Sequence, residues 1–156
     1  MESVMDTAPK LNCGSVFVDW KSGMILVGTG EINSSRSSYA GIGLLQSFDK
    51  GKTWKNIGLT DSHHISKILV NPKNSQEIVV GVAGHLYTKN KERGVFKTTD
   101  GGKSWQQVLF VNDETGVIDM AVAESNFTVM YASAWQKDRK AHNFNGNGKA
   151  SGIYKS

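Results

Sequence analysis

The 156-residue sequence contains one cysteine, two prolines and no long run of apolar residues. Because Cys13 is alone, an internal disulfide and a metal site built on cysteines are both excluded. A membrane-spanning helix needs about 18 or more apolar residues, and no stretch approaches that length. Residues 1–16 carry acidic side chains and lack the apolar segment of a secretory signal. We therefore expect neither a membrane span nor a signal peptide in this chain.

Strongly basic segments are absent as well. Eighteen Lys and Arg residues stand against fourteen Asp and Glu, which gives a formal net charge of +4. These basic residues are spread along the chain, without the aromatic-interleaved runs typical of nucleic-acid binding. We expect a solvated surface and no nucleic-acid partner. Seventeen glycines and 38% hydrophobic residues favour a turn-rich β protein.

What the sequence does contain is a repeat. SFDKGKTW at residues 47–54 returns as TTDGGKSW at residues 98–105, and each copy follows a short strand-like run, GLLQ or GVFK. A third copy begins with GIYKS at residues 152–156, which matches GVFKT at residues 94–98. The repeating unit is therefore a strand, a tight turn and a second strand that begins with Trp.

The residue types of this unit suit a tight reversal. An Asp side chain can accept hydrogen bonds from the unpaired backbone N–H groups of the turn, and a neighbouring hydroxyl can add another. Glycine supplies the positive φ, and Trp carries apolar surface into the space between neighbouring sheets. We assign these structural roles to Asp49 and Asp100, Ser47 and Thr98, Gly51 and Gly102, and Trp54 and Trp105.

The repeated turn resembles the Asp box, or bacterial neuraminidase repeat, shared by sialidases, xyloglucanases and the luminal domains of sortilin-type receptors. GTGE at residues 28–31, NPKNSQEIVV at 71–80 and RGVFKTTDGGKSW at 93–105 also resemble sortilin N-terminal-type and glycosidase-like repeat proteins. The resemblance covers residues 14–156. It implies a β-propeller, a structural role for the boxes and an extracytoplasmic location, although we expect no signal peptide in this chain.

We therefore predict an all-β fold: a partial β-propeller of about three four-stranded antiparallel blades, the last one incomplete. Residues 1–13 are expected to be a tail and residues 14–156 one domain. Its expected blades cover residues 14–57, 65–109 and, incompletely, 117–156. We expect the chain to be a fragment of a longer protein, whose open edges are covered by the remaining blades or by self-association.

The longest insertions fall between the second and third strands of each blade. They lie at residues 30–41, 84–93 and 135–151, at the end of the sheets opposite the Asp turns, together with the blade links 58–64 and 110–116. Loops held by a rigid scaffold are common binding sites, so this end is the expected functional face.

Several residues of this face are candidates for ligand binding. The three arginines of the chain, Arg36, Arg93 and Arg139, fall in the three insertions, where they could bind a carboxylate or be solvated loop residues. Trp135, with Tyr39 and Tyr87, could stack on sugar rings or pack the loops against the blades.

Glycan hydrolysis would need two carboxyl groups. Asp61 beside His63 and His64 is the densest titratable spot, and Glu31 lies on the same face; the alternative is a polar connection leading into a strand. Two adjacent histidines fall short of a metal site. We expect no metal and no cofactor.

Two functions remain open. The first is a scaffold or binding module that presents its loop face to a glycan, peptide or protein. The alternative is part of a glycoside hydrolase, sialidase- or xyloglucanase-like, whose catalytic carboxylates are only partly in this chain.

Overall fold

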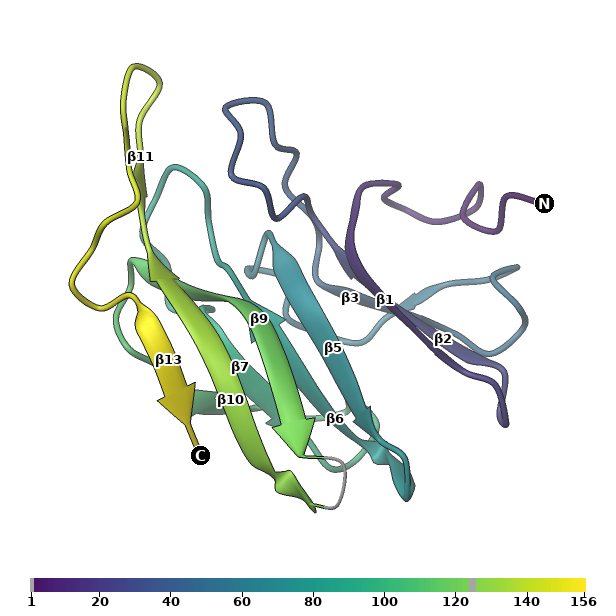
Figure 1. The fold of residues 1–156 in the computed structure, drawn as a ribbon. Coiled ribbons are helices and arrows are strands. Elements are labelled where there is room, and N and C mark those ends of the chain that lie inside the picture. The colour runs from purple at the N-terminus through teal and green to yellow at the C-terminus, as the bar shows by residue number, and fades with distance from the viewer. Residues whose placement is uncertain (1, 124–125) are drawn as a thin grey trace.

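The computed structural model describes residues 2–123 and 126–156, and all regular secondary structure in these ranges is β-strand (Figure 1). None of the described residues forms a helix that could cross a membrane. The first sheet contains, in spatial order, β1 (Cys13–Asp19), β2 (Met24–Thr29), β3 (Leu44–Ser47) and β4 (Lys55–Asn56). The second contains β5 (Ile65–Asn71), β6 (Asn74–Val82), β7 (Gly94–Thr98) and β8 (Gln106–Leu109).

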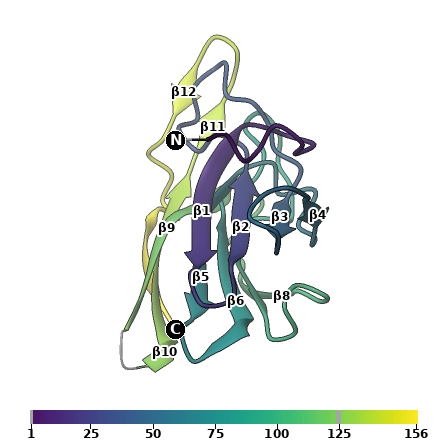
Figure 2. The same ribbon diagram turned by 90° about the vertical axis from the view of Figure 1, so that its right-hand side faces the viewer.

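The third sheet has three strands. β9 (Thr115–Ala123), β10 (Asn126–Gln136) and β13 (Gly152–Lys155) pair antiparallel in that order. β1, β5 and β9 are neighbours, so the sheets follow one another with their first strands together (Figures 1 and 2). The prediction of an all-β partial propeller with an incomplete last blade is confirmed.

Two apolar cores lie between the three sheets. Ile78, Val80 and Val82 of β6 belong to the core shared with the first sheet, whereas Val79 belongs to the core shared with the third. Successive side chains of a strand point to opposite faces. The unbroken apolar run of β6 therefore reflects burial on both faces, as expected for an inner blade.

The two Asp turns have matching hydrogen bonds. In the second, Thr98 Oγ1 donates to Asp100 Oδ1 (2.6 Å) and accepts from the Gly102 amide (3.0 Å), while Ser104 Oγ donates to Asp100 Oδ2 (2.6 Å). Gly102 has φ +90°, which residues with a Cβ resist. The first turn has the same arrangement around Asp49.

These hydrogen bonds favour the ionised carboxylates. The hydroxyl of Thr53, followed by its amide and the Ser47 hydroxyl, lowers the pKa of Asp49 to about 2. The Ser104 and Thr98 hydroxyls lower the pKa of Asp100 further. Both side chains are thus committed to their own turns.

The two tryptophans that follow these turns have different neighbours. Trp105 packs against the core of the first and second sheets, and its Nε1 donates to the Ile57 carbonyl (2.7 Å). Trp54 Nε1 donates to the Val4 carbonyl (3.2 Å). Val4 approaches Gly51 as Ile57 approaches Gly102. Val4, which belongs to the segment expected to be a tail, therefore takes the place at the first Asp turn that Ile57 of the preceding blade takes at the second.

The connection expected to be a polar loop, residues 135–151, contains regular structure. β10 continues through Gln136, and β11 (Asp138–Arg139) pairs with β12 (Phe144–Asn145). Trp135 Nε1 donates to the Gly146 carbonyl (2.9 Å), and its ring meets Phe144 edge-on at 5.5 Å. The long loop expected here thus includes a short two-stranded ribbon, which these aromatic contacts fold back on itself.

Candidate functional site

The long connections gather at one end of the sheets. Strands alternate in direction, so β2–β3 and β6–β7 connect at the end opposite the Asp turns, which join β3 to β4 and β7 to β8. Figure 1 shows these connections and the β11–β12 ribbon at the same end. We call this end, with the links at residues 58–64 and 110–116, the loop-rich end.

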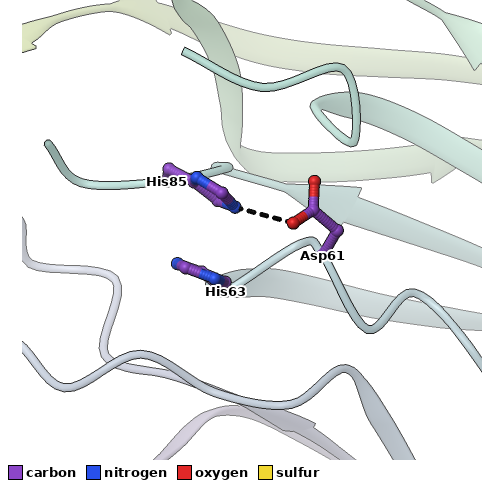
Figure 3. Close-up of side chains that lie close together, drawn as sticks. All are labelled: Asp61, His63 and His85. Atoms are coloured by element: carbon purple, nitrogen blue, oxygen red, sulfur yellow. Dashed lines mark hydrogen bonds and ion pairs between the residues drawn. The ribbon is translucent and has the colours of Figure 1, made fainter. Parts of the chain in front are cut away.

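Three titratable side chains meet there (Figure 3). Asp61 and His63 come from the link before β5, and His85 from the loop after β6. His85 Nε2 lies 3.1 Å from Asp61 Oδ1, and His85 Nδ1 lies 2.7 Å from Thr88 Oγ1. The His63 and His85 rings are stacked, with centroids 3.6 Å apart and an angle of 18° between their planes.

Neighbouring loops hold both histidines. The His63 carbonyl accepts a hydrogen bond from the Gly41 amide (2.6 Å), and a Cβ on Gly30 would overlap that carbonyl. The His85 amide donates to Asn90 Oδ1 (3.0 Å) and its carbonyl accepts from Arg93 Nη2 (2.8 Å). The first blade thus fixes His63, whereas the second fixes His85.

Burial changes the electrostatics of this cluster. It lowers the pKa of His63, with a smaller contribution from His85, while Asp61 opposes the shift. Burial also raises the pKa of Glu92, and the charge of Asp61 adds to that effect. Among the described residues, no side chain or backbone group hydrogen-bonds to Glu92 Oε2. A neutral imidazole and a carboxyl group that retains its proton more readily are groups suited to proton transfer.

The other two proposed catalytic candidates lie apart from this cluster. His64 is 2% exposed, its ring centroid is 6.3 Å from that of His63, and burial, then Lys137, lowers its pKa to about 4. The Glu31 main chain faces the His64 ring and also bonds to the Tyr39 carbonyl (3.2 Å). The structure therefore groups Asp61 and His63 with His85.

Arg93 and Arg139 line one cavity, and Arg36 is not among its lining residues. Arg93 is 2% exposed, and its guanidinium donates to the carbonyls of Ala83 (2.8 Å), His85 (2.8 Å) and Thr88 (2.9 Å). Burial lowers its pKa to about 10. Arg139 lies over the Phe144 ring at 4.8 Å. Arg36 lies in the loop after β2, where its carbonyl accepts from the Tyr87 hydroxyl (2.7 Å).

A buried lysine accompanies two of these arginines. Lys137 is 7% exposed, lines a cavity of about 130 Å³ with Arg93 and Arg139, and bonds through Nζ to Ser34 Oγ. Burial, followed by the charges of Arg93 and Arg139, lowers its pKa to about 8.

The aromatic candidates also differ. Trp135 is half-buried and packs the β11–β12 ribbon, whereas Tyr39 and Tyr87 are 67% and 49% exposed. The two tyrosines therefore present aromatic surface to solvent on adjoining loops.

The sequence reasoning missed His85, Glu92 and Lys137. A signal for His85 existed, because β5 and β6 form a hairpin in which Ile65 pairs with Val82. Residues just before β5 and just after β6 must then share one end of the sheet, which brings His63 toward His85.

No protein-family model matches the sequence, and a search of curated proteins finds no similar one. Solved structures do share the fold. A glycoside hydrolase family 74 (GH74) enzyme from Niastella koreensis has a TM-score of 0.58 at 20% identity over 90% of this chain. An ancestral GH74 enzyme has a TM-score of 0.59 at 22% identity over 79% of this chain. The GH74 xyloglucanase from Xanthomonas campestris has a TM-score of 0.53 at 16% identity over 90% of this chain.

This chain spans only 19%, 17% and 24%, respectively, of those three enzymes. At such identities the likeness describes the fold, which is that of propeller-type glycoside hydrolases.

Proposed function

We propose that this chain is a section of an Asp-box propeller, related to glycosidase-like and sortilin-type repeat proteins, whose loop-rich end binds a glycan. The observation that carries the proposal is the meeting of Asp61, His63 and His85 beside loops that expose Tyr39 and Tyr87. Sugar rings offer apolar faces to aromatic side chains and hydroxyls to polar ones, and carbohydrate sites need both. This makes the chain a scaffold and binding module.

The shared fold suggests the first ligand to try. One of the similar structures is a xyloglucanase, so xyloglucan oligosaccharides are the natural starting probe, followed by a wider glycan array. Tyr87 is suited to stacking, because the bond from its hydroxyl to the Arg36 carbonyl restrains the ring.

Aromatic substitutions test this proposal. Tyr39→Ala and Tyr87→Ala should each weaken binding by roughly fivefold or more, since an aromatic contact contributes about 1 kcal/mol. Trp20→Ala is the matched control, because Trp20 is 89% exposed near the β1–β2 turn at the opposite end. Binding that depends on Trp20, or on none of the three, would contradict the proposal.

A second function, glycoside hydrolysis, is favoured by one pair of residues. Glu92 has a raised pKa and lies near Asp61, so one carboxyl group could act as the acid and the other as base or nucleophile. Release of reducing ends from xyloglucan that disappears in both Asp61→Asn and Glu92→Gln would establish hydrolysis. Binding without hydrolysis would leave the binding module as the function.

A further inference from the structure

We propose that Asp61, His63 and His85 form a binding site for a divalent transition-metal ion, with zinc as the best match. The site uses the same three residues as the proposed glycan-binding end, but the inference rests on their donor atoms alone. Two imidazoles and one carboxylate are the donor types that zinc uses when three protein ligands leave a fourth position open. Magnesium and calcium prefer oxygen donors, so the two histidines argue against them.

The donor atoms already lie close together. One atom from each of Asp61, His63 and His85 falls within 4.8 Å of the others. Bonds of about 2.0–2.1 Å to one zinc ion place tetrahedral donors about 3.3 Å apart, close to the 3.1 Å between Asp61 Oδ1 and His85 Nε2, so His63 is the ligand that must move. The three residues come from two separate connections, so binding would also link the start of β5 to the end of β6.

Both ring nitrogens of His85 lie next to side-chain oxygens. A histidine that binds a metal through one ring nitrogen usually donates the other N–H to a nearby oxygen, which fixes the ring. Thr88 Oγ1 is that oxygen, 2.7 Å from His85 Nδ1. With the proton on Nδ1, the lone pair of Nε2 faces the carboxylate of Asp61 at 3.1 Å. A metal ion bound between Nε2 and the carboxylate selects this tautomer; without an ion, Nε2–H can donate to Asp61 while the Thr88 hydroxyl donates to Nδ1.

His63 is held in an unusual conformation. Its φ is +54°, a left-handed value that non-glycine residues rarely adopt unless the surrounding structure imposes it. Here the bond from the Gly41 amide to the His63 carbonyl fixes the backbone, while the side chain stacks on His85. Stacked rings cannot both aim a lone pair at one ion. Metal binding must therefore turn His63 out of the stack, which gives the proposal a spectroscopic signature.

The fourth position can be filled from solvent. The donor group consists of Asp61, His63 and His85, and Asp61 is exposed, so a water molecule can complete four-coordination.

The test is calorimetric titration of the chelator-treated full chain with zinc chloride. We expect one ion per chain with a Kd below about 10 µM. His63→Ala and His85→Ala should each weaken binding about 100-fold, and Thr88→Val, which removes only the outer hydrogen bond, about 10–100-fold. His142→Ala is the matched control, since His142 is exposed near the tip of the β11–β12 ribbon.

A spectroscopic readout on the wild-type chain does not depend on how the variants fold. Zinc should shift the imidazole NMR signals of His63 and His85 most and leave that of His142 in place. Absence of binding at 1 mM zinc (about 100 times the expected Kd), or binding that requires His142, would overturn the proposal. Glycan titrations repeated in excess chelator show whether glycan binding persists without a metal ion. Failure of the metal proposal can then be told apart from failure of the glycan proposal.

Discussion

Replacing Trp105 by Ala tests how neighbouring blades adhere. The indole packs on the core between the first two sheets, and its Nε1 donates to the Ile57 carbonyl at 2.7 Å. Removing a fully buried Trp costs about 3–5 kcal/mol. Because this indole is only partly buried, we expect packing to contribute about 2 kcal/mol and the hydrogen bond about 1 kcal/mol. Trp105→Ala should therefore lower the free energy of unfolding by about 3 kcal/mol.

Two companion variants separate the contributions. Trp105→Phe keeps most of the ring and should lose only about 1–2 kcal/mol. Trp54→Ala is the matched control, because its indole bonds to Val4 in the N-terminal segment at 3.2 Å and should cost about 1 kcal/mol. Urea unfolding followed by far-UV circular dichroism measures all three without relying on tryptophan fluorescence. A loss below about 1 kcal/mol for Trp105→Ala, or equal losses for both tryptophans, would refute blade packing through this residue.

Three further outcomes are expected. Hydrogen bonds lower the pKa of Asp49 to about 2 and that of Asp100 further. The stability that these carboxylates contribute is therefore present above pH 3.8 and is lost as the pH falls through their folded-state pKa values. Asp100→Ala should reduce this acid dependence in a pH series of unfolding curves. Lys137 has a folded-state pKa of about 8, against an ordinary value of 10.5. The unfolded chain therefore binds more protons between these two pH values, and stability should rise with pH across that window. Lys137→Met should remove the rise and raise stability at pH 7 by about 1–3 kcal/mol, and an unchanged pH profile would contradict this. Val16 and Ile153 expose apolar surface on the first and third sheets, so light scattering should show self-association, and a stable monomer would count against it.

The repeated turns made the architecture predictable from local sequence. SFDKGKTW and TTDGGKSW specify their own hydrogen bonds within a few residues, so the hairpins they close and the sheets around them could be located. The β11–β12 ribbon was missed because its two-residue strands depend on contacts of Trp135 and Phe144 rather than on an alternating pattern. The contact between Val4 and Trp54 likewise spans residues far apart in sequence.

The candidate site was predictable only in part for the same reason. Asp61 and His63 stand together in sequence and were proposed, whereas His85 joins them through the pairing of β5 with β6. Arg93 illustrates the opposite case. Its position in a polar loop favoured an exposed cation, but the guanidinium is buried and donates hydrogen bonds to three nearby backbone carbonyls.

The most direct test of the loop-rich end as the binding face is a residue-resolved NMR titration of the chain with xyloglucan oligosaccharides. The expected result is a set of amide shifts confined to residues 30–41, 58–64 and 84–93, with the largest changes near Asp61 and Tyr87. Shifts centred on the turns of Asp49 and Asp100 at the other end would contradict it.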